Sequence, residues 1–342
     1  MTLQADLNTI WFFIVGILLT GYAVLDGFDL GVGALHLLTK EDRHRRILLN
    51  AIGPVWDGNE VWLVTGGGAL FAAFPVVYAT AFSGFYLAFM LLLVALIFRG
   101  VAIEFRSKRE SVRWRRLWDV SFSAGSILSA VLIGVALGNV ALGVPLDSEF
   151  EYAGGFLDLL HPYALVVGAT VVALFIMHGT IFLLMKTEGD LHQQVKGWVR
   201  PSIIGFVLLY AITTLLTLLY VPHMTETVRA EPLLIVVPIV SVLAIANIPR
   251  EAFHERSFRA FLSSCAAMIS LMALFGIGLY PRMIYSQPLP ENSLTIYNAA
   301  SSDATLKIML LIAILGVPLV LAYTSGIYWL FRGKVTIDDT SY

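Results

Sequence analysis

The stretch Tyr86-Leu-Ala-Phe-Met-Leu-Leu-Leu-Val-Ala-Leu-Ile-Phe98 decides the fold class, because it ends a run, residues 77–98, without a charged side chain. About 20 apolar residues are enough for a helix to cross the hydrocarbon core of a membrane. Of the 342 residues, 58% are hydrophobic and 13% are charged, and the mean hydropathy is +0.81. The sequence therefore predicts an all-α integral membrane protein. It excludes a soluble enzyme, a disordered chain, a nucleic-acid binder and a secreted disulfide scaffold.

Apolar windows of about 20 residues on both sides of this stretch predict nine transmembrane helices in all. They form one membrane domain that covers residues 1–342. The second window is weak, because it contains Asp57, Glu60 and the glycine run 66–68. The seventh is short, and we expect it to end near Pro249. The predicted spans are 8–38, 52–74, 77–103, 118–140, 161–186, 199–220, 232–248, 258–280 and 305–331.

The distribution of Lys and Arg predicts the orientation of these helices. With the N-terminus outside, the cytoplasmic connections hold 19 of the 22 basic residues. This count places Arg99 in the second connection, which begins at that residue. Positive charge collects on the cytoplasmic side of membrane proteins, so the predicted topology is N-out and C-in. The cytoplasmic segments in this topology are 39–51, 99–117, 186–200, 249–259 and the tail after the last span.

Acidic side chains inside predicted spans are the first candidates for function, because an ionisable group at membrane depth is costly. Asp26 and Asp29 are three residues apart and so share one helical face, as do Asp57 and Glu60. Two carboxylates this close can share a proton, which suits a proton relay. The alternatives are that Asp29 is solvated or paired with a loop arginine, and that Asp57 caps the start of a helix.

Three further polar residues lie at or inside span ends. Glu104 closes the third span before a basic segment, where an exposed ion pair is the alternative to function. Asp119 is expected to stabilise the start of the helix of the fourth span rather than to take part in chemistry. His178 lies inside the fifth span and could ligate haem iron, although a buried histidine is more often a hydrogen-bonded core residue. The histidine and cysteine spacings predict no metal site.

Several of these segments together resemble subunit II of the cytochrome bd-type quinol oxidases, a family that includes the cyanide-insensitive oxidases. The resemblance is strongest over residues 10–145, and the sequence does not separate the two branches. The weaker matches are 134–139 with 143–145, and 299–302. The stronger matches are 23–33, 54–62, 66–75, 78–86, 98–108 and 118–119.

The resemblance implies a heterodimer with a homologous, haem-bearing subunit I in a bacterial or archaeal cell membrane. Each subunit would have nine spans, arranged as two four-helix bundles plus one peripheral helix. Haem b and haem d and their ligands are expected mainly in subunit I. The complex would take electrons from the quinol pool at the outer face and reduce dioxygen to water with cytoplasmic protons. A structural quinone, bound lipids and a small accessory subunit are further expectations.

The resemblance also implies a proton path along the subunit interface that uses acidic residues of subunit II. The matching positions are Asp26, Asp57 and Glu104, with Asp29 beside them, and Glu104 stands where some relatives have aspartate. Relatives often have an amide at position 60, so the role of Glu60 stays open.

Two other functions compete with the oxidase subunit. A proton-coupled secondary transporter could use the same carboxylates, but transporters usually carry broken helices in both halves of the chain. In a purely structural membrane partner, the acids would only hold helices together. Here the polar residues gather in the first half, which favours the oxidase subunit over the transporter.

Overall fold

The computed structural model describes residues 6–337, which are almost entirely helical. Two short strands, β1 (Arg282–Ile284) and β2 (Leu294–Thr295), pair antiparallel. The helices are α1 (Leu7–Leu35), α2 (Asp42–Ile52), α3 (Trp56–Ala73), α4 (Pro75–Gly84), α5 (Tyr86–Phe105), α6 (Val112–Leu142), α7 (Pro162–Lys186), α8 (Gly189–Tyr220), α9 (His223–Ala230), α10 (Val236–Phe253), α11 (Ser257–Leu279) and α12 (Asp303–Leu330).

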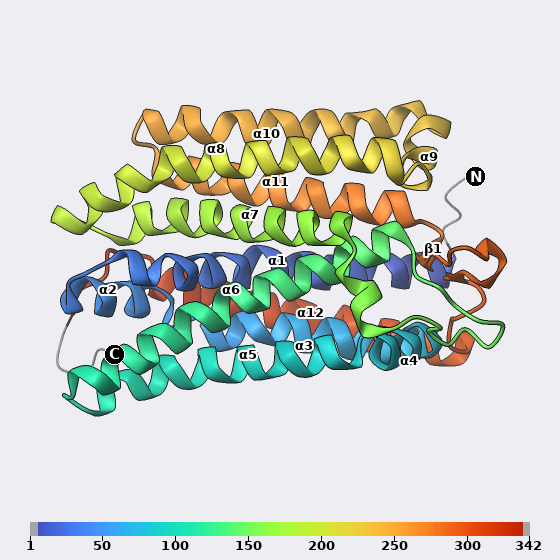
Figure 1. The fold of residues 1–342 in the computed structure, drawn as a ribbon, viewed down its shortest axis with the longest axis horizontal. Coiled ribbons are helices and arrows are strands. Elements are labelled where there is room, and N and C mark those ends of the chain that lie inside the picture. Colours follow the sequence, from blue (N-terminus) through green and yellow to red (C-terminus); the bar gives the residue numbers. More distant parts are fainter. Residues whose placement is uncertain (1–5, 338–342) are drawn as a thin grey trace.

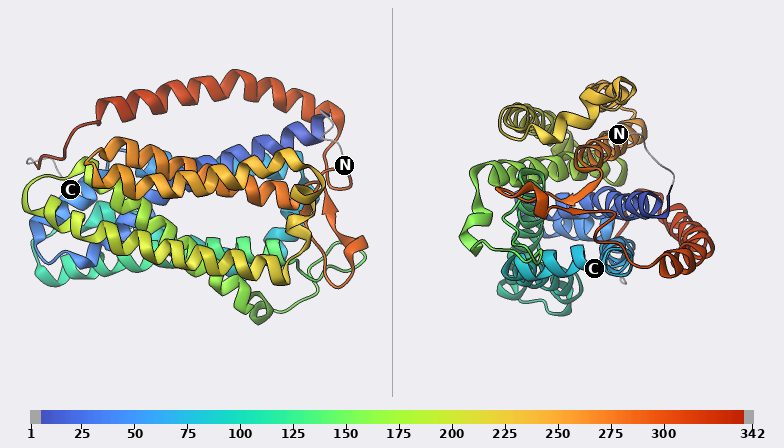
Figure 2. Two further views of the ribbon diagram at one scale, coloured as in Figure 1. Left: turned by 90° about the horizontal axis from the view of Figure 1, so that it is seen from above. Right: turned by 90° about the vertical axis from the view of Figure 1, so that its right-hand side faces the viewer.

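The long helices run along one common axis, with α8 and α10 at one edge of the view and α3 and α5 at the other (Figure 1). Short connections gather at the two ends of this bundle. Figure 1 shows α2 at one end, and α4, α9 and β1 at the opposite end. Helix α12 arches over the rest of the bundle as a separate layer (Figure 2).

Within residues 6–337, eight helices are long and apolar enough to cross a membrane: α1, α5, α6, α7, α8, α10, α11 and α12. This confirms the predicted all-α fold of apolar helices. The predicted second span corresponds to α3, which is not among the eight because Asp57, Asn59 and Glu60 lower the hydropathy of its first two turns. The total of nine spans therefore stays a prediction.

Several span boundaries differ from those predicted. The third predicted span is two helices, since α4 ends at Gly84 and α5 begins at Tyr86. Helix α8 begins ten residues before the predicted start of the sixth span at residue 199. Helix α10 continues through Pro249 to Phe253, so the predicted end there is wrong. Proline is tolerated inside membrane helices because neighbouring groups and local adjustments satisfy the freed backbone carbonyl.

Glycines let the central helices approach closely. A Cβ atom built on Gly31 of α1 would lie 1.8 Å from the backbone oxygen of Phe175 in α7, and one on Gly179 would lie 2.7 Å from Gly31. Gly134 and Gly138 of α6 meet α7 in the same way. Because lipid offers no hydrophobic drive for helix association, such close packing supplies much of the attraction between α1, α6 and α7.

Helix α12 is held mainly at its two ends. Near its start, Trp11 of α1 donates its indole N–H to the carbonyl of Leu306 at 3.0 Å. After its end, Lys186 donates to the carbonyl of Phe331, and Val335 donates its backbone N–H to the carbonyl of Lys186 at 2.9 Å. Most of the helix between these anchors is exposed.

Candidate functional site

A cluster of polar side chains from α1, α3 and α5 lies inside the bundle. Arg99 of α5 binds both oxygens of Asp26, with its Nη2 2.6 Å from Oδ1 and its Nη1 3.2 Å from Oδ2. The same Nη1 lies 2.5 Å from Oε1 of Glu60, and Nη2 lies 3.9 Å from Oδ2 of Asp29. We call Asp26, Asp29, Asn59, Glu60 and Arg99 the acid cluster.

Local sequence explains why three helices bring these groups together. The three-residue spacing of Asp26 and Asp29 turns both carboxylates to one face of α1, as predicted. Gly21 leaves space for the ring of Trp62, because a Cβ atom at position 21 would lie 2.3 Å from that ring. Helix α3 can therefore lie against α1 and present Glu60 to Arg99.

Asn59 completes the acid cluster. Its amide Nδ2 donates to Oδ2 of Asp29 at 2.7 Å and to the carbonyl of Leu25 at 3.1 Å. Its Oδ1 accepts a hydrogen bond from the hydroxyl of Tyr328 at 2.8 Å. This residue is 1% exposed, so every polar group of its side chain is used inside the protein.

The acid cluster holds three carboxylates and one guanidinium. Asp26, Asp29 and Arg99 are fully buried, whereas the side chain of Glu60 is 24% exposed. Unbalanced charge at membrane depth costs several kcal/mol. A bound proton is the simplest charge that offsets the excess of carboxylates. Carboxylates this close can share a proton, and Glu60 is the exposed member of the cluster.

The other two candidate acids lie outside the acid cluster. Asp57 is exposed in the first turn of α3, one turn before Glu60, in the position where a carboxylate favours the helix N-terminus. Glu104 is half-buried on α5, five residues after Arg99 and next to the end of that helix. Both lie within about two turns of the acid cluster along their own helices.

The position of Arg99 corrects the sequence analysis. Arg99 was expected in a cytoplasmic connection, but it is fully buried within α5. The signal was present in the sequence, since position 99 also falls inside the predicted span 77–103. An arginine at that depth needs acidic partners inside the protein. In the structure, those partners are Asp26 and Glu60. Asn59 and Tyr328 were missed as well, because a neutral polar side chain does not stand out by composition.

A second buried ionic cluster lies near the start of α6 and corrects the expectation for Asp119. Helix α6 begins at Val112, so Asp119 lies two turns inside the helix and not at its start. It is 1% exposed and binds His36 at 2.6 Å, Arg45 at 2.8 Å and Arg106 at 2.5 Å. These contacts tie α2 and the residues directly after α1 and α5 to α6, and they indicate a structural role.

His178 does not have the environment of a haem ligand. Its Nδ1 lies 2.7 Å from the hydroxyl of Ser264, and its Nε2 lies 3.0 Å from the carbonyl of Val24. The ring also stacks on Phe261 with centroids 5.0 Å apart. Because both ring nitrogens are hydrogen-bonded, neither is available to iron in this arrangement.

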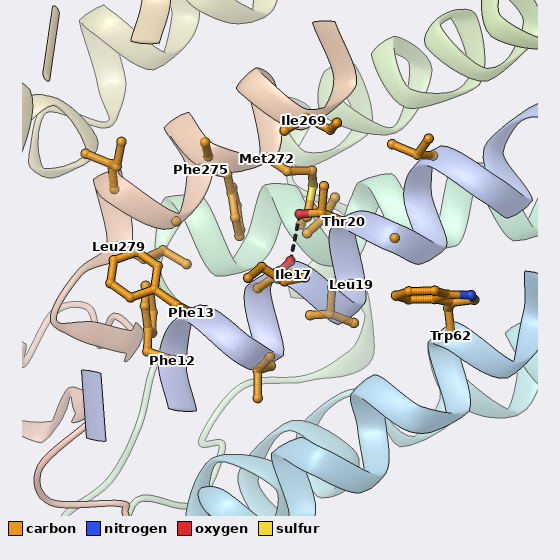
Figure 3. Close-up of a pocket in the computed structure, with 18 of the residues that line it drawn as sticks. Phe12, Phe13, Ile17, Leu19, Thr20, Trp62, Ile269, Met272, Phe275 and Leu279 are labelled. Carbon is orange, nitrogen blue, oxygen red and sulfur yellow. Dashed lines mark hydrogen bonds between the residues drawn. The ribbon is translucent and has the colours of Figure 1, made fainter. Parts of the chain in front are cut away.

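A cavity of about 1200 Å³ lies between α1, α11 and α12. Figure 3 shows its mainly apolar walls, with Phe12 and Ile17 of α1 facing Met272 and Phe275 of α11. The few polar groups on its lining include Thr20 of α1, whose hydroxyl donates to the carbonyl of Gly16. From α12, the lining receives Leu321, Thr324, Ser325 and Tyr328.

Known proteins resemble this chain over nearly its whole length. The family model described as cytochrome bd terminal oxidase subunit II matches residues 7–331. Subunit 2 of the Escherichia coli K12 cytochrome bd-I ubiquinol oxidase is 37% identical, over 97% of this chain and 96% of the relative. Subunit 2 of the Bacillus subtilis cytochrome bd ubiquinol oxidase is 35% identical, over 97% and 98%. The solved bd oxidase of Geobacillus thermodenitrificans shares the fold, with a TM-score of 0.79, 18% identity, and coverage of 95% of this chain and 98% of the matched chain. This chain therefore belongs to the cytochrome bd terminal oxidase subunit II family, and it is a membrane subunit of a quinol oxidase, an oxidoreductase of aerobic respiration.

Proposed function

We propose that this chain pairs with a haem-bearing subunit I and carries cytoplasmic protons toward the partner's haems through the acid cluster. The complex would oxidise quinol and reduce dioxygen to water in a bacterial or archaeal cell membrane. Two relatives support this activity, because both are named ubiquinol oxidase subunits. The observation that carries the role of this subunit is the excess of carboxylates over arginine in the acid cluster.

The proposed route begins at the end of the bundle that holds α2. Exposure falls stepwise from Asp57, which is exposed, through Glu60, at 24%, to Asp26 and Asp29, which are fully buried. Such a gradient suits entry of protons from water and their transfer into an apolar interior. Glu104, on the same helix as Arg99, is a second entry candidate.

The charge distribution supports an entry on the cytoplasmic side. The basic connections of the predicted N-out, C-in topology include residues 39–51, which contain most of α2, and 99–117, which contain the first residues of α6. Asp57 lies five residues after the end of α2 and therefore close to these basic segments. Proton uptake from the cytoplasm would make turnover electrogenic without a pump.

The haems are proposed to lie in the partner subunit. His178 does not fit iron ligation, because both of its ring nitrogens are hydrogen-bonded. Among residues 6–337, no group of three or more histidine, cysteine or acidic side chains could hold a metal ion. The residues of this chain would therefore bind and move protons and support assembly, while redox chemistry takes place on the partner's groups.

The structural quinone implied by the resemblance has a fitting site in the apolar cavity between α1, α11 and α12. Its walls suit an isoprenoid chain, and Thr20 and Tyr328 are among the polar residues of the lining, with both hydroxyls donating to groups of this chain. The proton-coupled transporter is not favoured, because the described acid cluster lies in the first half of the chain and the relatives are oxidase subunits.

The test compares Asp26→Asn and Asp57→Asn in the purified complex. Both substitutions remove a proton-binding oxygen with little change of shape, so they should slow quinol-driven oxygen uptake while the visible haem spectrum stays normal. General acid–base groups contribute typically 10²- to 10⁴-fold, and partial bypass would reduce that loss. Glu149→Gln is the control, because Glu149 is an exposed acid in the connection between α6 and α7.

Loss of haem together with activity would assign Asp26 or Asp57 to assembly. Normal oxygen uptake and normal proton uptake by vesicles in both variants would refute the relay. A haem-free protein that purifies alone and transports a solute would refute the oxidase subunit itself.

A further inference from the structure

Helix α12 is hydrogen-bonded to the acid cluster through Tyr328, although most of the helix stands apart from the bundle (Figure 2). Tyr328 lies in the last turn of α12 and is half-buried. Its hydroxyl donates to Oδ1 of Asn59 at 2.8 Å across 269 positions of the sequence. The outermost helix is thereby hydrogen-bonded to a buried amide that itself contacts Asp29.

The two acceptors of the Asn59 amide fix which way it points, and its Oδ1 accepts a hydrogen bond from the hydroxyl of Tyr328. With Oδ1 toward Tyr328, the NH₂ group faces two acceptors, the carbonyl of Leu25 and the carboxylate of Asp29. The flipped amide would place its oxygen against those two acceptors. Since all these groups are away from water, the flipped arrangement would lose two hydrogen bonds.

The two oxygens of Asp29 consequently have different surroundings. Oδ2 accepts the N–H of Asn59 at 2.7 Å and lies 3.9 Å from Nη2 of Arg99. Oδ1 is buried and has no hydrogen-bond partner among residues 6–337. An oxygen that faces two N–H donors is a poor place for an added proton, because that proton would point at another donor.

We propose that Asp29 takes its proton on Oδ1, and that Asn59 and Tyr328 are positioning residues that keep Oδ2 as the hydrogen-bonded carbonyl oxygen. This inference rests on the proton path proposed above and adds to it the protonated atom and a role for α12. The proton on Oδ1 can leave only when another acceptor comes within hydrogen-bonding distance. Asp29 would therefore hold a proton at the inner end of the proposed route. The charged or titratable groups that act on Asp29 are Asp26, Glu60 and Arg99, and those that act on Tyr328 are Asp29, Asp26 and Cys265 of α11.

Infrared difference spectroscopy of the purified complex tests the proposal. The carbonyl band of protonated Asp29 is identified by its loss in Asp29→Asn. A hydrogen bond to a carbonyl oxygen lowers its stretching frequency, so Asn59→Leu should shift the band to higher wavenumber. Tyr328→Phe should shift the band in the same direction but by less, because it removes only the hydrogen bond that the amide oxygen of Asn59 accepts and so weakens the amide as a donor to Asp29.

Tyr323→Phe is the matched control, since Tyr323 lies on the same helix and is 70% exposed. It should leave the band unchanged, and normal haem spectra establish that each variant complex is assembled. An Asn59→Leu band at the wild-type position would overturn the proposal, and so would the absence of any band assignable to Asp29.

Oxygen uptake by the same preparations separates this inference from the proposed function. Normal uptake in Asp29→Asn would remove Asp29 from the proton path and would overturn its role as a store on that path. Oxygen uptake could instead be slow in Asp29→Asn while the carbonyl band of Asp29 stays at the wild-type position in Asn59→Leu and Tyr328→Phe. That result would support the proton path and refute the positioning role of Asn59 and Tyr328.

Discussion

Replacement of Arg99 by leucine should be among the most destabilising single changes in this chain. The substitution removes the one guanidinium of the acid cluster. The carboxylates of Asp26, Asp29 and Glu60 would then lie near one another without a positive charge in the cluster. Breaking a buried ion pair by removing one partner costs about 3–5 kcal/mol, because the remaining charge is buried without compensation.

Geometry decides how that cost is divided. The contact with Asp26 is bidentate and fully buried, so it should account for most of the lost free energy of unfolding. The contact with Glu60 should supply less, because this side chain is 24% exposed and water screens it. A loss of 3–5 kcal/mol would lower the ratio of folded to unfolded protein by about 10²- to 10⁴-fold.

The assay is the heat-induced unfolding of the complex in detergent, followed by loss of the assembled particle. Arg113→Leu is the matched control, since Arg113 is an exposed arginine in the first turn of α6 and its loss should change stability by about 0.5 kcal/mol or less. Adding Asp26→Asn to Arg99→Leu should restore part of the stability, because it removes the charge left unpaired. Equal stability of Arg99→Leu and Arg113→Leu would refute the reasoning about the acid cluster.

Two further predictions concern packing and pH. Gly31→Ala should cost about 1–3 kcal/mol, because its Cβ atom would lie 1.8 Å from the backbone oxygen of Phe175. Gly67→Ala, with open space around the new methyl group, should leave the thermal midpoint nearly unchanged, and equal midpoints for both variants would argue against close packing of α1 on α7. His223 in α9 is 5% exposed and hydrogen-bonds the carbonyl of Ala141 at 2.8 Å, and burial lowers the pKa of His223 below its usual value. The neutral histidine stabilises the fold above about pH 6.5, and this contribution is lost as pH falls, because the unfolded chain binds the proton more readily. Thermal midpoints measured at acidic and neutral pH should therefore differ less in His223→Gln than in the wild type, and an unchanged difference would contradict this assignment.

Part of the candidate site could be predicted from local sequence. The three-residue spacing of Asp26 and Asp29 places both carboxylates on one face of α1 wherever that helix lies, and the structure confirms this face. Asp57 lies in the first turn of α3, near the expected helix start, but the N-cap is Val55 and no side chain of the described residues caps this helix, so a capping role for Asp57 stays a prediction. Whether these acids carry protons stays a prediction.

Other parts depended on where helices lie in space. Counting charges assigned Arg99 to a connection, because the count sorts residues by position along the chain and not by depth. Asp119 was expected at a helix start for the same reason, yet α6 begins two turns earlier and buries it beside His36 and Arg106. Charges within a turn or two of a span end cannot be placed by hydropathy alone.

Sequence by itself determined that this chain is an all-helical membrane protein of the bd oxidase subunit II family, because hydropathy and motif content are properties of contiguous residues. Only the tertiary structure decided which groups meet in the acid cluster. Arg99 follows Asp26 by 73 positions, and Tyr328 follows Asn59 by 269. No local pattern encodes such contacts, since they arise from the packing of α1, α3, α5 and α12. In an apolar interior, buried charges and amides must find partners wherever that packing brings them within reach.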